Sequence, residues 1–197
     1  ITDVRADLYA AAIGYARAIR LGRLQGLVTG GVPYVLGYVK GNVLEEATEV
    51  RRSGLADLRV KMSLNLLGTK AMNREEFAKA PKRTILGVSL AVQAPTGQYD
   101  PAKLINLGTN RWAFKPEVGV SVPVGRWYLD AYAGAWFFTS NDQFYSGSAT
   151  RRQDPLTVLQ AHGSYVFKSR AWLAIDATVI RAQAQAAILL ADVEDQL

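Results

Sequence analysis

Regular alternation of apolar and polar side chains between Gly54 and Leu67 is the feature that most constrains how this chain can fold. Apolar residues occupy every second position from Ala56 to Leu66, and charged or polar residues fill the positions between them. Because successive side chains of a strand point to opposite faces, this period of two predicts a strand with one apolar and one charged face. The same pattern recurs at 84–94 and 112–122.

The length of these segments favours a membrane barrel over a water-soluble sandwich. Strands of globular proteins usually have about 5 to 6 residues, whereas a tilted strand that crosses a bilayer needs about 9 to 11. Weaker copies of the pattern lie at 5–19, 24–40, 127–139, 156–167 and 171–180. With about eight candidate strands, residues 1–180 are predicted to form an all-β, antiparallel, up-and-down transmembrane β-barrel.

The connectors and the aromatic residues agree with this architecture. Outer-membrane barrels have short turns on one rim, long loops on the other, and aromatic girdles near both ends of their strands. The expected short connectors are 22–23, 123–125 and 168–170, and the expected long ones are 41–53, 95–111 and 140–155. The 68–81 connector is longer than this scheme predicts.

Composition argues against several other classes of protein. The chain has no Cys and one His, so we expect no disulfide, no metal site and no cofactor. Its net charge of +6 is spread out without a run of Lys or Arg longer than a pair, which makes nucleic acid an unexpected partner. No basic segment followed by an apolar one opens the chain, so we expect any export signal to be absent from it.

Ordered motifs between Gly54 and Thr178 resemble those of the outer-membrane family known as the putative MetA-pathway of phenol degradation. The motifs are Gly54–Arg59, Asn65–Gly68, Ala94–Asp100, Leu104–Trp112, Phe114–Gly119, Phe137–Thr139, Gln153–Pro155 and Leu173–Thr178. The resemblance implies a monomeric barrel of about twelve strands in the bacterial outer membrane. It also implies passive uptake of small aromatic or hydrophobic compounds, with the lipid bilayer, lipopolysaccharide and the solutes themselves as partners.

Residues 181–197 depart from this family pattern. They are rich in alanine and glutamine and show no alternation, so they predict a separate tail that is helical or disordered. An open sheet cannot sit in lipid with unpaired edges, so we expect the strands to close on themselves, to recruit another chain or to fail to insert.

Charged residues on the polar strand faces are the candidates for lining a lumen. They are Asp57, Arg59, Lys61, Lys115, Glu117, Asp130 and Asp176. The alternative is that ion pairs among them hold the barrel in shape. The long 97–111 loop is a candidate constriction or solute-sensing segment or, alternatively, a packed structural loop; its candidate residues are Gln98, Tyr99, Asp100, Asn106, Asn110 and Arg111.

His162 and Ser164 form the one pattern that suggests catalysis. Their spacing places both side chains on one strand face and resembles the arrangement in the eight-stranded lipid A 3-O-deacylases, with Asp176 as a candidate third member. Such a pair often arises by chance, so we expect no enzyme activity. The predicted function is a passive outer-membrane channel; the alternatives are an outer-membrane lipid hydrolase and a non-conducting structural barrel.

Overall fold

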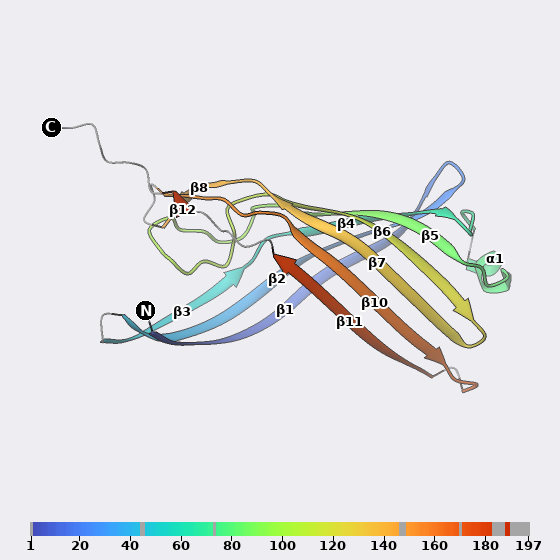
Figure 1. Ribbon diagram of the computed structural model, residues 1–197, viewed down its shortest axis with the longest axis horizontal. Helices are drawn as coiled ribbons and strands as arrows, with labels where there is room; N and C mark the ends of the chain where they lie inside the picture. Colours follow the sequence, from blue (N-terminus) through green and yellow to red (C-terminus); the bar gives the residue numbers. More distant parts are fainter. Residues whose placement is uncertain are drawn as a thin grey trace.

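A computed structural model describes residues 2–43, 46–72, 74–145, 149–169, 171–182 and 188–189 of the chain. These residues form an almost entirely β structure (Figure 1). The strands are β1 (Thr2–Leu21), β2 (Leu24–Val43), β3 (Glu46–Leu55), β4 (Arg59–Leu67), β5 (Ile85–Gln93), β6 (Ala113–Val124), β7 (Trp127–Phe138), β8 (Asn141–Phe144), β9 (Ala149–Arg151), β10 (Leu156–Val166), β11 (Trp172–Ala182) and β12 (Ile188–Leu189). A single short helix, α1 (Arg74–Lys79), lies within the described ranges.

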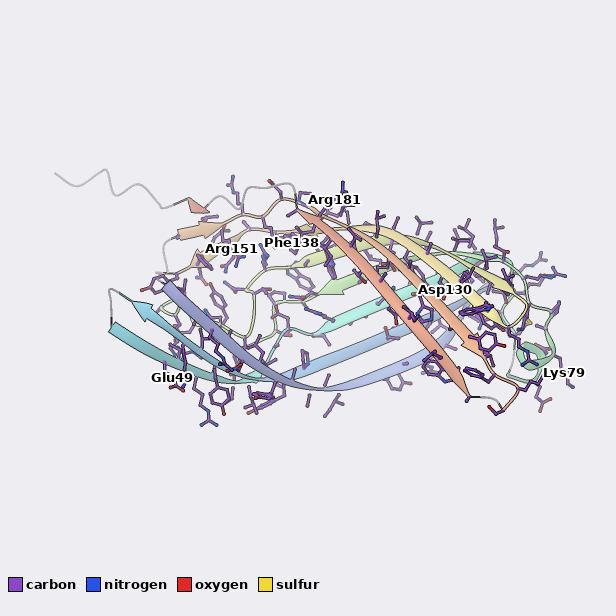
Figure 2. The ribbon with its side chains drawn as sticks, turned by 60° about the horizontal axis from the view of Figure 1, so that its bottom comes forward. Glu49, Lys79, Asp130, Phe138, Arg151 and Arg181 are labelled. Atoms are coloured by element: carbon purple, nitrogen blue, oxygen red, sulfur yellow. The ribbon has the colours of Figure 1, made fainter. Side chains whose placement is uncertain are left out.

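The main sheet is an antiparallel meander. Its order is β1-β2-β4-β5-β6-β7-β10-β11, and β3 pairs with the second half of β2. The predicted all-β, up-and-down fold is therefore confirmed, and each of the eight strand segments expected from alternation is present. No pairing joins β11 to β1 in the described part of the chain, so the sheet curves into an open half-barrel (Figure 2).

The two ends of the sheet differ in their connections. Two-residue turns with positive φ at Gly22 and Gly125 join β1 to β2 and β6 to β7, and α1 lies at this same end (Figure 1). The 68–81 connector, which is longer than the scheme of short turns predicts, contains that helix. The longer loops lie at the opposite end, toward which Glu49 lies, whereas Lys79 of α1 lies at the turn end (Figure 2).

The prediction of a loop at 41–53 is wrong for most of its length. β2 extends to Val43, and β3 runs from Glu46 to Leu55. This hairpin has polar residues on both of its faces, so it lacks the alternation from which the other strands were predicted. The segment expected as one strand from Gly54 is also interrupted at 56–58, where Asp57 turns away to bind a loop.

The strands β4 to β7 carry apolar side chains on one face and most of their charged and polar side chains on the other. We call the face that carries Arg59, Lys61, Ser89 and Glu117 the inner face, and the opposite one the outer face. On β6, Glu117 of the inner face is 7% exposed, whereas its outward neighbour Val118 is 47% exposed. A water-soluble sheet has the reverse arrangement, and a membrane barrel has this one. None of the helical structure described is long and apolar enough to span a membrane.

The end of the chain is described only in part. β11 continues to Ala182, two residues beyond the predicted end of the barrel region, and β12 pairs with β9 at the rim. Residues 183–187 and 190–197 of the predicted tail lie outside the described residues. The helical or disordered tail therefore stays a prediction.

Candidate functional site

Glu117 is the centre of a charged cluster on the inner face. Its Oε1 accepts hydrogen bonds from Lys61 Nζ at 2.6 Å and Ser89 Oγ at 3.0 Å, and its Oε2 accepts one from Lys115 Nζ at 2.7 Å. The register explains the cluster, because Ser89 stands directly opposite Glu117 and Lys115 is two residues away on the same face. Two ammonium groups therefore share one buried carboxylate.

Polar contacts continue from this cluster across the sheet. Lys115 Nζ donates to Gln160 Oε1 at 3.4 Å, and Gln160 Nε2 donates to Thr178 Oγ1 at 3.4 Å. β7 contributes two aromatic rings to this face. Lys61 Nζ lies 5.9 Å from the ring centre of Tyr132, and Lys115 Nζ lies 5.7 Å from that of Trp136. The result is a continuous polar and aromatic band from β4 to β11.

His162 and Asp176 form a second inner-face pair. His162 Nδ1 lies 2.6 Å from Asp176 Oδ1, and Asp130 stands opposite His162 on its other side in the β7 register. Ser164 makes no hydrogen bond with His162 in the described part of the structure. An orienting acid and a base are thus present, but the proton-transfer contact that would activate a serine nucleophile is not.

Two hollows lie on the inner face and adjoin at Lys61. The larger has a volume of about 350 Å³ and is bordered by the cationic side chains Arg59, Lys61 and Lys115 together with Trp136. The smaller has a volume of about 200 Å³ and is lined by Lys61, Glu117, Tyr132, Gln160, His162 and Thr178, among others. Within the ranges that the structure describes, no group of three or more His, Asp or Glu side chains is placed to hold a metal ion.

Asp57 attaches the loop between β5 and β6, residues 94–112, to the inner face. We call this segment the rim loop. Asp57 Oδ1 accepts a hydrogen bond from Gly97 N at 2.9 Å, and Oδ2 accepts bonds from Thr109 N at 2.9 Å, Thr109 Oγ1 at 2.6 Å and Gln93 Nε2 at 2.9 Å. Gln93 Oε1 in turn accepts a bond from Arg59 Nε at 3.0 Å. Asp57 is 3% exposed, so its side chain serves the rim loop rather than an open surface.

The six rim-loop residues predicted as a constriction are tied into local packing. Gln98 bonds through its backbone to Leu55 and Gly108, and Tyr99 Oη donates to the Gln143 carbonyl at 2.8 Å. Asn106 Oδ1 accepts from Asp100 N at 2.9 Å, and Asn110 Nδ2 donates to Asn141 Oδ1 at 3.0 Å. These bonds agree with the packed-loop alternative, and the constriction role stays a prediction.

The surroundings of two charged residues in the rim loop lower their pKa values. The Lys103 ammonium, followed by the backbone N–H of Ala102, lowers the pKa of Asp100. Burial, and then repulsion from Arg151, lowers the pKa of Arg111. The Arg111 guanidinium donates to Gln153 and lies 4.5 Å from the Phe138 ring centre. Arg111 therefore packs against the β7 end of the sheet instead of extending into solvent.

Replacing Gly97 with alanine should loosen the rim loop. A Cβ at this position would lie 2.7 Å from Gly108 Cα and 2.8 Å from Asp57 N, so the loop would have to move, at a cost of about 1–3 kcal/mol. Limited proteolysis should then cleave within residues 94–112 faster than in the unchanged chain. Gly163→Ala is the control, because its Cβ would meet only the Leu129 side chain at 3.8 Å. Equal cleavage of the two variants would show that this close packing is dispensable.

The structure brings some of the predicted lumen residues together and separates others. Lys61, Lys115 and Glu117 form one cluster, Asp176 bonds to His162, and Arg59 is linked to Asp57 through Gln93. Asp130 stands opposite His162 in register. The prediction omitted Ser89, Gln93, Tyr132, Trp136, Gln160 and Thr178. All of these lie on the same strand faces as the predicted charges, so selecting only charged residues was too narrow.

Comparisons with known proteins agree with this fold. The COG4313 outer membrane channel from Pseudomonas putida F1 is similar to the chain with a TM-score of 0.74 and 24% sequence identity. The match covers 95% of this chain and 65% of that channel, so the chain spans about two thirds of the channel's length. No curated protein matches the chain. The model of the family described as "Putative MetA-pathway of phenol degradation" matches residues 4–181, and the chain belongs to this family.

Proposed function

We propose that this chain forms the wall of an outer-membrane channel through which small solutes pass without an energy source. The observation that carries the proposal is the distribution of side chains on β4 to β7, which expose apolar residues outward and carry their charged residues on the inner face. Family membership and the likeness of the fold to an outer membrane channel support it. Aromatic or hydrophobic compounds, a monomeric state and contacts with lipopolysaccharide belong to the same proposal.

Closure of the wall is a condition of this function. β1 and β11 are the edge strands of the described sheet, and unpaired edges are not tolerated in lipid. In the membrane, these edges must therefore pair with each other or with further strands. The function is therefore tested on the full chain after it has folded into a membrane.

Reconstitution of the folded chain into liposomes and planar bilayers tests the channel function. We expect liposomes that contain the folded chain to swell in isotonic solutions of small solutes, and planar bilayers to show discrete conductance steps. Folding is checked in the same preparation by a β-type circular dichroism spectrum. A folded, inserted chain that gives neither swelling nor conductance steps would leave the non-conducting structural barrel as the better description.

The contact between His162 and Asp176 favours one alternative, an outer-membrane lipid hydrolase. Such an enzyme needs a nucleophile in contact with the base, and its active site must reach the acyl chains of a lipid. Ser164 makes no hydrogen bond with His162 in the described residues. Its place on the inner face also separates it from the lipid. We therefore infer that the chain is not an enzyme. Release of fatty acid from lipid A that disappears on His162→Ala would contradict this inference.

A further inference from the structure

The larger inner-face hollow has the dimensions and the chemistry of a ligand subsite. Its volume of about 350 Å³ falls within the range of about 300–1,000 Å³ that is typical of small-molecule sites. Lys61, Lys115 and Arg59 border it, and Trp136 contributes an aromatic wall. Small or apolar residues make up most of the rest of its lining, which consists of Thr29, Gly30, Gly31, Val60, Ala91 and Val92.

The cations around this hollow outnumber the carboxylates that neutralise them. Lys61 and Lys115 share the single carboxylate of Glu117. Arg59 bonds through Nε to the neutral Gln93, and in the described residues it forms no ion pair. Asp57, which is bound to the same Gln93, is enclosed by the rim loop. Even when both acids are counted, one positive charge is left over beside the hollow.

We propose that this hollow is a subsite for a small aromatic carboxylate. The carboxylate group lies between the free edge of the Arg59 guanidinium and the Lys61 ammonium, where two charge-assisted hydrogen bonds replace its water shell. The aromatic ring packs against Trp136 and the small residues of β2 and β5. A neutral aromatic alcohol of the same size lacks the ionic contact and binds more weakly.

The proposal rests on the channel function and makes its solute class specific. A solute that moves along the inner face passes this hollow, and a carboxylate held by two flexible cations in an open site is released readily. The subsite therefore selects among the solutes that enter the channel. Solute binding to the subsite can be measured on the folded chain without measuring conductance.

Fluorine NMR on the folded full chain in detergent micelles tests the subsite, with para-fluorobenzoate and para-fluorobenzyl alcohol as probes. We expect the acid to bind about tenfold more tightly than the alcohol, and Arg59→Gln to weaken binding of the acid by about tenfold, which corresponds to one charge-assisted contact. The matched control is Arg126→Gln, which removes an exposed cation from the turn end of the sheet and should leave binding unchanged. Trp136→Leu should weaken both probes.

The outcomes separate the subsite from the channel. Equal affinity for the acid and the alcohol, or equal loss in Arg59→Gln and Arg126→Gln, would overturn the subsite even if the chain conducts. Selective binding of the acid by a chain that neither conducts nor swells liposomes would support the subsite and contradict the channel. Arg59 lies at an exposed position, so its replacement is expected to leave the fold intact, which a β-type circular dichroism spectrum verifies.

Discussion

Replacing Asp57 with alanine is expected to free the rim loop from the inner face and to lower the free energy of unfolding by about 3–5 kcal/mol. The Asp57 carboxylate accepts four hydrogen bonds, from Gly97, Gln93 and both the backbone and the hydroxyl of Thr109. A fully buried donor left without an acceptor costs about 1–3 kcal/mol, and the sum is smaller here because the Gly97 and Thr109 donors are only partly buried. Urea titration of the chain folded in lipid vesicles measures the loss.

Two companion variants separate the role of this carboxylate from a general loss of charge. Asp57→Asn keeps one acceptor oxygen, so it should retain part of the stability. The gain is limited because the new amide NH₂ group faces other hydrogen-bond donors. Asp142→Ala removes an exposed carboxylate at the same rim and should change the free energy of unfolding by less than about 0.5 kcal/mol. If Asp57→Ala matched Asp142→Ala, the rim loop would be held by contacts other than these four bonds.

The strands could be predicted from sequence because membrane strands repeat a strict rule. On β4, β5 and β6, the outward positions are apolar and the inward positions are mostly polar or small, so the alternation extends over most of each strand. β3 escaped prediction because the strand itself carries polar residues on both faces. Its residues Arg51 and Arg52 show this, since one packs on the Tyr38 ring and the other bonds to Ile105 of the rim loop.

The inner-face cluster could be predicted only as a set of charges and not as a set of contacts. Alternation placed Lys61, Lys115 and Glu117 on one face, but only the register of β4, β5 and β6 shows that the two lysines meet the same carboxylate. Asp57 was predicted to line a lumen because it continues the alternation of β4. Its three bonds to the rim loop and its fourth to Gln93 depend on residues 36 to 52 positions away, which no local pattern encodes.

Replacing Glu117 with alanine should have the second large effect. It removes the carboxylate that two ammonium groups share, and the Lys115 side chain is 12% exposed, so water can hydrate it only in part. Breaking a buried ion pair from one side typically costs about 3–5 kcal/mol, because the remaining charge is left without compensation. We expect a loss of this size in urea titration of the vesicle-folded chain.

The double variant Lys115→Met with Glu117→Leu distinguishes uncompensated charge from lost packing. It removes the buried cation together with its partner and keeps side chains of similar volume, so it should recover more than half of the stability lost in Glu117→Ala. Lys61, with 38% of its side chain exposed, can remain hydrated without Glu117. If the double variant were as unstable as Glu117→Ala, the cluster would stabilise the wall by its shape and hydrogen bonds. Recovery would mean that the charges are not needed for stability, and it would favour the proposed role of these charges in binding solutes.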